Sequence, residues 1–226
     1  MRFDQLALGA FFKRWGFLTP PEIPADPQRD AAFEALWQQA VYGRILDYQL
    51  PYPKSWFTRW LVDEKPVLLH GSNRGGLEEL TPRQQTNFSG KRVEGVFASS
   101  DGIWPLFFAA INYQNPRFRV TRNGCFTIGT DKFYCFNISE EAFEGEVWTS
   151  GWVYILPAEG FVSQDPGGLW QDEWVCPHPV LPLVALAVSA EDFPFKAEVV
   201  GFPQGEGVLQ TWRKYGRRRA SAAQSD

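Results

Sequence analysis

The residues best suited to chemistry lie in the segment LLHGS, where His70 follows an apolar run and precedes Gly71 and Ser72. A histidine at the end of a buried strand can simply bond a neighbouring carbonyl, and a glycine after it can serve only a turn. The same atoms can also hold a ligand, because glycine lets a flat group approach the main chain and imidazole can bond a sugar hydroxyl. The other histidine, His178, lies between two prolines, and we expect it to be structural. This segment alone leaves both interpretations of His70 open.

Two later segments favour the ligand-binding interpretation. The segment GVFASSD places Phe97 between small residues and leads into a stretch rich in Phe and Trp. The segment DEWVCP places Glu173 beside Trp174 at the start of an expected strand. Because His70 and Glu173 are far apart in the sequence, they can meet only if a sheet brings their strands together.

The order of these three segments resembles the poly(ADP-ribose) polymerase-like, or diphtheria-toxin-like, class of ADP-ribosyltransferases, which carries His, Tyr and Glu in this order. The resemblance extends from about Pro66 to Val188, and HGS is its best match. It implies an ADP-ribosyltransferase-like fold with a split, largely antiparallel sheet. It also implies that NAD is the substrate, and that ADP-ribose passes to an unknown acceptor with release of nicotinamide.

The resemblance implies a role for each matching residue. His70 would bind the ribose on the nicotinamide side, Gly71 would hold the carboxamide through its backbone, and Ser72 would complete the turn. Phe97 stands where the family usually has tyrosine, so its ring can stack on nicotinamide but offers no hydroxyl. Glu173 would be catalytic, because a fixed carboxylate stabilises the charge of an oxocarbenium-like transition state.

Further contacts with NAD would come from residues that follow these motifs. Phe107 or Phe108 would cover the other face of the nicotinamide, and Asn73 and Arg74 would lie near the pyrophosphate. The arginine-rich segment 117–122 can also neutralise a pyrophosphate, although an exposed strand face is the simpler expectation. No metal is expected, because three cysteines without a C-x-x-C motif and two histidines give few ligands.

Three alternatives remain open. The chain can be a catalytically inactive module that binds NAD or ADP-ribose, or a relative that uses NAD to modify RNA ends. The segments QDEW and WTSGW also resemble the arginine-serine-glutamate class of ADP-ribosyltransferases, but that class leaves His70, Gly71 and Ser72 without a role.

Composition limits the partners and the compartment. The chain has 226 residues, a formal net charge of −4 and 44% hydrophobic residues. The excess of acidic residues argues against nucleic acid as a partner, because phosphate binding needs clustered Lys and Arg. The N-terminus is not typical of a signal peptide, and no apolar stretch is long enough to span a membrane. We therefore expect a cytoplasmic protein whose partners are NAD and an acceptor such as a protein; the oligomeric state stays open.

The pattern of elements predicts an α+β fold. Helical spacing predicts an N-terminal helical segment over residues 1–64, with helices near 6–15, 30–46 and 51–64. Residues 65–212 would form the ADP-ribosyltransferase-like domain and residues 213–226 a flexible basic and polar tail. Within the domain, Asp101 is expected to cap a helix with Pro105 in its first turn, and Asn123-Gly124 to form a hairpin turn. The other apolar runs are expected to be strands: 66–70, 93–100, 132–139, 147–157, 172–177, 183–189 and 197–202.

Overall fold

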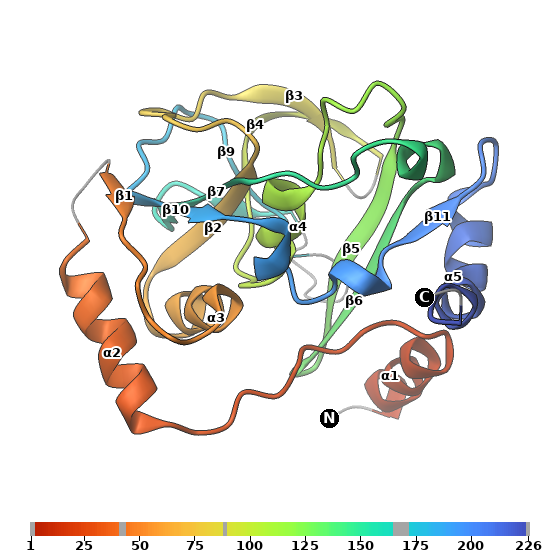
Figure 1. Cartoon of the computed structure of the whole chain (residues 1–226), viewed down its shortest axis with the longest axis horizontal. Helices are drawn as coiled ribbons and strands as arrows, with labels where there is room; N and C mark the ends of the chain where they lie inside the picture. The colour runs from red at the N-terminus through yellow and green to blue at the C-terminus, as the bar shows by residue number, and fades with distance from the viewer. Residues whose placement is uncertain (1–2, 41–43, 88–89, 165–171, 225–226) are drawn as a thin grey trace.

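The fold is α+β with largely antiparallel sheets, as the sequence predicted (Figure 1). The computed structural model describes residues 3–40, 44–87, 90–164 and 172–224. The helices are α1 (Phe3–Arg14), α2 (Pro27–Gln38), α3 (Lys54–Glu64), α4 (Trp104–Ala110) and α5 (Val208–Ala222). The strands are β1 (Arg44–Leu46), β2 (Val67–Ser72), β3 (Arg83–Thr86), β4 (Arg92–Ala98), β5 (Thr121–Ile128), β6 (Asp131–Ser139), β7 (Gly151–Pro157), β8 (Val162–Ser163), β9 (Trp174–Cys176), β10 (Val184–Val188) and β11 (Val200–Phe202).

The strands form three sheets, with the orders β1-β10-β7-β2, β3-β4-β9-β8 and β11-β6-β5. Pairing is antiparallel except where β1 joins β10 and β11 joins β6. The first two sheets meet where β4 ends: the amides and carbonyls of Leu69 and Ser99 exchange two hydrogen bonds of 2.9 Å. The end of β4 therefore lies between β2 and β9, so three segments distant in the sequence become neighbours.

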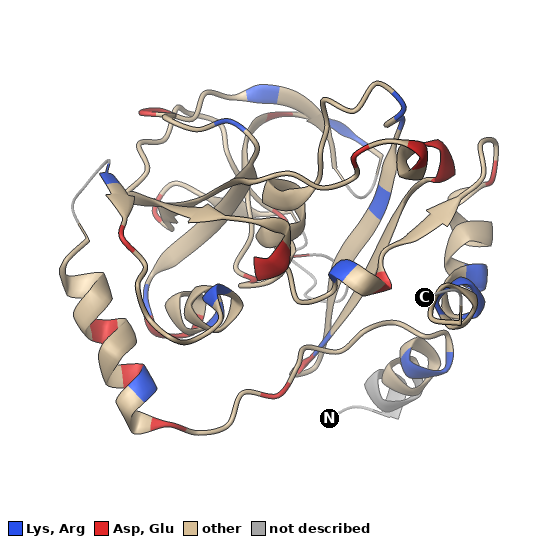
Figure 2. Ribbon diagram, viewed as in Figure 1, with Lys and Arg blue, Asp and Glu red and all other residues tan. Residues whose placement is uncertain are grey.

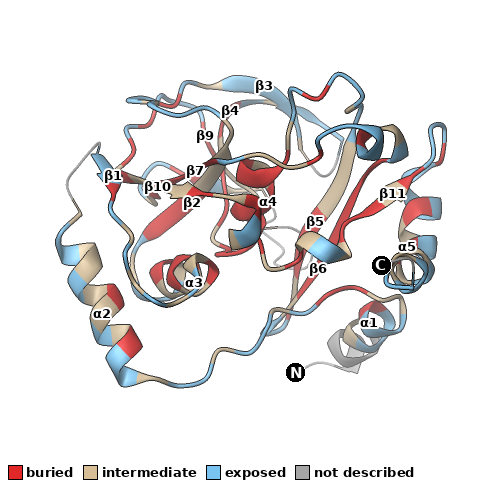
Figure 3. Cartoon of the chain, in the orientation of Figure 1, coloured by how far each residue is buried: buried red, intermediate tan, exposed pale blue. Residues whose placement is uncertain are grey.

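Helix α4 lies at the centre of the molecule, where it packs closely on β2 and β7 (Figure 1). Two glycines permit this approach. A Cβ on Gly71 would lie 1.9 Å from the carbonyl oxygen of Pro105, and one on Gly151 would lie 2.1 Å from that of Ala109. Gly71 is thus required by helix packing, whatever its role toward a ligand. Figure 3 shows that α4 is almost entirely buried.

The N-terminal helices contribute to the same core as the strands. Phe33 of α2 and Phe57 and Leu61 of α3 are fully buried in one cluster with residues of β2, β7 and α4. The expected helix over 30–46 is shorter than predicted, because α2 ends at Gln38 and residues 44–46 form β1. Strand β1 pairs with β10, a tertiary contact that local spacing does not encode.

The C-terminal segment is a packed helix, and the flexible tail predicted from residue 213 is wrong through Ala222. Tyr215 of α5 is fully buried, and its hydroxyl accepts a hydrogen bond of 3.2 Å from the amide of Phe136. The buried Glu206 pairs with Arg218 at 2.5 Å and Lys214 at 2.8 Å. The hydrogen bond from Arg218, foremost, lowers the pKa of Glu206 to about 2. The basic residues thus fix α5 to the fold.

The hairpin turn predicted at Asn123-Gly124 is also wrong. Both residues lie inside β5, where Asn123 pairs with Phe136 and Gly124 with Cys135. The chain reverses instead after Ile128, where Gly129 has a φ of 64°. The register of two long strands with buried side chains outweighs the local turn preference of Asn-Gly.

Candidate functional site

A cavity of about 1080 Å³ opens beside the junction of β2, β4 and β9. This volume lies just above the range of about 300–1,000 Å³ that is usual for ligand-binding pockets. Of the residues predicted from the sequence, those that line it are His70, Gly71, Ser72, Asn73, Arg74, Phe97, Phe108 and Glu173. The structure therefore brings the HGS, GVFA and DEW segments to one cavity.

His70 is held in one tautomer by the end of β4. Its Nδ1 lies 2.7 Å from the carbonyl oxygen of Phe97. Because a carbonyl can only accept, Nδ1 carries the hydrogen and Nε2 of the neutral ring is an acceptor. Burial lowers the pKa of His70, and the charge of Arg83 lowers it further, against the opposing effect of the Phe97 hydrogen bond. The neutral ring is thus favoured at pH 7, and it suits a donor such as a hydroxyl.

The main chain of Gly71 faces the cavity edge of β2. Leu69 directs its N–H and C=O to Ser99 of the neighbouring sheet. In an antiparallel ladder, residues two apart direct their backbone groups to the same side, so those of Gly71 point to the β4 side of β2, where Gly71 and Phe97 line the cavity. Because α4 occupies the Cβ side of Gly71, the backbone groups are what this residue can offer to a ligand.

The loop after β2 is fixed from below by Tyr154 of β7. The Tyr154 hydroxyl donates to the carbonyl of Arg74 at 2.6 Å and accepts from the amide of Leu77 at 3.2 Å. Asn73 donates from Nδ2 to the carbonyl of Ala109 at 2.7 Å, and Ser72 Oγ accepts from the amide of Arg74 at 3.1 Å. Sequence reasoning missed Tyr154, whose only signal is a phenol within the apolar run VYILP.

Glu173 directly precedes β9, and it lines the cavity. Its two neighbours contact each other, because Trp174 Nε1 donates to Asp172 Oδ1 at 3.0 Å, and neither of them lines the cavity. The carbonyl of Glu173 accepts from the amide of Gln164 at 2.8 Å, so its backbone is held on the β8 side.

Aromatic rings form a second part of the wall. Phe97, Trp104, Phe108 and Trp212 line the cavity, and the rings of Trp104 and Phe108 are 5.5 Å apart. Phe107, the other predicted nicotinamide contact, is fully buried and packs on Phe136 with ring centres 4.9 Å apart. One residue along a helix turns the side chain by about 100°, so only Phe108 of this pair reaches the cavity wall.

The wall is rich in positive charge. Arg74, Arg83 and Arg122 line the cavity together with the carboxylate of Glu173. Figure 2 shows Lys and Arg on β3 and β5, the strands that contain Arg83 and Arg122, in a chain with a formal net charge of −4. The Arg122 guanidinium donates to Thr211 Oγ1 and the Glu206 carbonyl, and lies 4.0 Å from the ring centre of Phe202. Arg83 had no signal in the sequence beyond its charge. Such a wall favours an anionic ligand.

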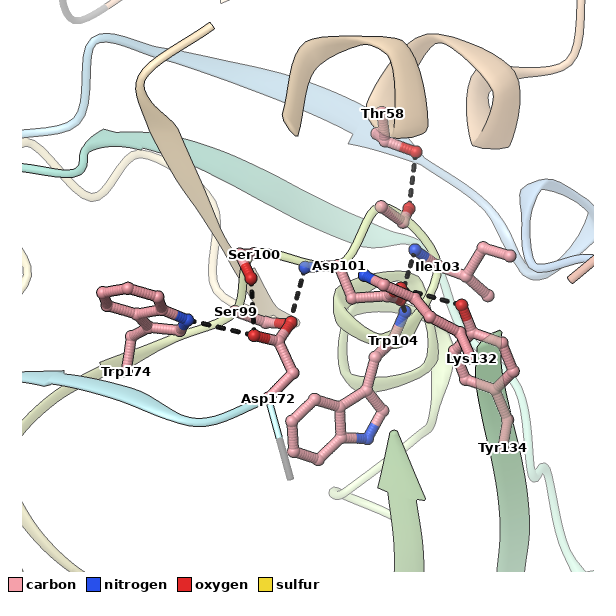
Figure 4. Close-up of polar contacts among 11 residues, drawn as sticks. Thr58, Ser99, Ser100, Asp101, Ile103, Trp104, Lys132, Tyr134, Asp172 and Trp174 are labelled. Atoms are coloured by element: carbon pink, nitrogen blue, oxygen red, sulfur yellow. Dashed lines mark hydrogen bonds and ion pairs between the residues drawn. The ribbon is translucent and has the colours of Figure 1, made fainter. Parts of the chain in front are cut away.

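Beneath the cavity, Asp101 bonds the amides that lead into α4 (Figure 4), although the N-cap residue of the helix is Ile103, whereas the sequence predicted Asp101. Its Oδ1 accepts from the amides of Ile103 at 2.8 Å and Trp104 at 2.7 Å. Its Oδ2 accepts from Lys132 Nζ at 2.9 Å and the Tyr134 hydroxyl at 2.7 Å. Burial alone would raise the pKa of Asp101, but Lys132 and the donated hydrogen bonds outweigh it and hold the pKa below its usual range.

No protein-family model, curated protein or solved structure matches the chain. Within the described residues, no three or more His, Cys, Asp or Glu side chains are grouped to hold a metal ion. In the same part of the chain, no helix has the length and apolar character needed to cross a membrane. The cysteines Cys125, Cys135 and Cys176 are buried thiols.

Proposed function

We propose that the chain is an NAD-dependent ADP-ribosyltransferase, which transfers ADP-ribose from NAD to an acceptor and releases nicotinamide. One observation carries this proposal. His70, Phe97 and Glu173, from three separate segments, line one cavity in the order that resembles the family. Three arginines that line the same cavity suit the pyrophosphate of a dinucleotide.

The geometry supplies a role for each group. Nicotinamide would lie against the Phe97 ring, with its carboxamide on the backbone of Gly71 and Phe108 on the wall nearby. The Nε2 of neutral His70 would accept a hydrogen bond from a ribose hydroxyl. As the bond between nicotinamide and ribose breaks, its electron pair leaves with nicotinamide and positive charge develops on the sugar. The Glu173 carboxylate would stabilise that charge and take the proton of the attacking acceptor.

The first test measures binding and turnover with the wild-type protein. NAD should raise the melting temperature, because a ligand that binds only the folded state stabilises it, by about 2.7 kcal/mol at one hundred times its Kd. Nicotinamide release from labelled NAD, with cell lysate as a source of acceptors, reports transfer. An unchanged melting curve in millimolar NAD contradicts the proposal.

The substitution Glu173→Gln separates catalysis from binding. It keeps the shape of the side chain and removes the charge that matters most in the transition state, so nicotinamide release should fall about a hundredfold with little change in NAD affinity. Glu159→Gln, which removes an exposed carboxylate between β7 and β8, is the matched control and should leave the rate unchanged. Equal rates in wild type and Glu173→Gln would remove Glu173 from the catalytic role.

A second candidate function follows from Phe97. Its ring has no hydroxyl where the family it resembles usually has tyrosine, which favours a module that binds NAD or ADP-ribose without turnover. Phe97→Tyr should raise nicotinamide release if the missing hydroxyl limits the rate. Binding of NAD without release in the wild type, in Phe97→Tyr and in Glu173→Gln would favour the binding module.

A further inference from the structure

Three donors converge on the carboxylate of Asp172, directly before Glu173 (Figure 4). Ser99 Oγ donates to Oδ2 at 2.6 Å, and Ser100 Oγ and Trp174 Nε1 donate to Oδ1 at 2.6 Å and 3.0 Å. The amide of Asp172 also donates to the carbonyl of Cys125 at 3.1 Å. Side chain and backbone of this one residue therefore join β9 to the end of β4 and to β5.

These contacts fix the backbone on both sides of Glu173. Asp172 is tied to β4, and Trp174 pairs with Ala98 of β4 and with Ser163 of β8. The carbonyl of Glu173 itself accepts from Gln164. Strand β9 begins only at Trp174, so ladder pairing alone does not hold the residues before it. The hydrogen bonds of the Asp172 carboxylate fix this segment, which strand pairing does not reach.

We infer that Asp172 is a positioning residue, which sets the direction in which the Glu173 carboxylate enters the cavity. This inference rests on the proposed function, because the position of Glu173 matters through its effect on the transition state. Glu173 lines the cavity and Asp172 does not, so Asp172 acts through the backbone without touching the ligand itself. Ser99 and Ser100 close the β4 strand that carries Phe97, so the same contacts hold two parts of the cavity wall in register.

The expected effect is on the rate. A carboxylate displaced by about 1 Å can lose on the order of a hundredfold in rate while the ligand still binds. Asp172→Ala should lower kcat for nicotinamide release by about tenfold or more, with a change in KM for NAD below about threefold. Asp172→Asn keeps one acceptor oxygen and should recover part of the rate. A purely structural role would lower the melting temperature without this division between kcat and KM.

Two milder variants guard against loss of folding. Ser100→Ala and Trp174→Phe each remove one donor to Oδ1 and keep the carboxylate, so the double variant should lower kcat several-fold at a nearly unchanged melting temperature. Glu159→Gln is the control for loss of a carboxylate at the surface. Wild-type kcat in both Asp172→Ala and the double variant overturns the inference.

Amide hydrogen exchange distinguishes failure of this inference from failure of the proposed function. Amides 172–174 should exchange faster in Asp172→Ala than in the wild type or Glu159→Gln, whether or not the protein turns over NAD. A wild type that releases no nicotinamide overturns the proposed function. Faster exchange in Asp172→Ala would then still support the inference that Asp172 fixes the backbone at Glu173, and unchanged exchange would overturn that inference.

Discussion

Asp101 and Asp172 are two hydrogen-bonded carboxylates in different surroundings, joined by one serine. Ser99 Oγ donates to Asp172 and accepts from the amide of Asp101 at 3.0 Å. Asp101 is 2% exposed and meets a charged lysine, a phenol and the first amides of α4. Asp172 is half-buried and meets two hydroxyls and an indole. The first arrangement stabilises the fold, and the second orients a residue in the cavity wall.

The charge of the partners explains this difference. A buried carboxylate must be paired, and removal of its pair leaves an uncompensated charge. Neutral donors to a half-buried carboxylate fix the direction of that side chain. When such a donor is removed, water can replace part of the lost hydrogen bonding. The stability of the fold should therefore depend strongly on Asp101. The orientation of the Glu173 side chain should depend on Asp172.

Asp101→Ala should have the largest effect on stability. It removes the acceptor for the amides of Ile103 and Trp104 at the entry to α4 and the partner of Lys132, so the free energy of unfolding should fall by about 3 kcal/mol. Urea denaturation followed by Trp fluorescence measures it, with Asp172→Ala as the comparison, for which we expect a loss of about 1 kcal/mol. Equal losses in the two variants would abolish the distinction between these carboxylates.

Lowering the pH should reduce the free energy of unfolding through protonation of Asp101, by less than Asp101→Ala does. The pKa of Asp101 in the folded protein lies below the ordinary value of 3.8, so the unfolded chain binds the proton more tightly. The contribution to stability is complete above pH 4 and is lost as the pH falls through the folded pKa. Urea unfolding between pH 7 and pH 3 should show a shallower acid dependence in Asp101→Ala than in the wild type. Parallel curves would contradict the lowered pKa.

The smallest of the three effects is expected when one hydrogen-bond donor to each carboxylate is removed. Tyr134→Phe removes a buried hydroxyl that donates to Asp101 and should reduce the free energy of unfolding by about 1–2 kcal/mol. Trp174→Phe removes a half-buried donor to Asp172 and should cost less than about 1 kcal/mol. The same denaturation experiment compares them. A larger loss in Trp174→Phe would mean that Asp172 also holds the fold.

The sequence predicted those elements that its local pattern encodes. Apolar runs marked β2, β4, β6 and β10, and Asp101 with Pro105 marked the start of α4. The Asn123-Gly124 turn failed because strand register decided the position of the reversal. Helix α5 was missed because its composition is polar, and it is fixed by Tyr215 and by ion pairs to a residue outside the helix.

Only part of the cavity wall could be predicted, because strand pairing brings residues to it that no local pattern marks. His70, Phe97 and Glu173 followed from the order of three short motifs. Strand pairing places Arg83 opposite Gly95, where it lines the cavity, and Tyr154 opposite His70, where it supports the loop after β2, and no nearby residue signals either position.

Strand β3 gives the cavity a wall on which the core does not depend. Arg83, Gln85 and Thr86 line the cavity, yet every side chain of this edge strand is exposed (Figure 3). Substitutions at exposed positions usually change stability by less than about 0.5 kcal/mol. Over evolutionary time, the range of bound ligands can therefore diverge through β3, while the buried supports beneath His70 and Glu173 stay constant. A library randomised at these three positions would sample new specificities in folded proteins.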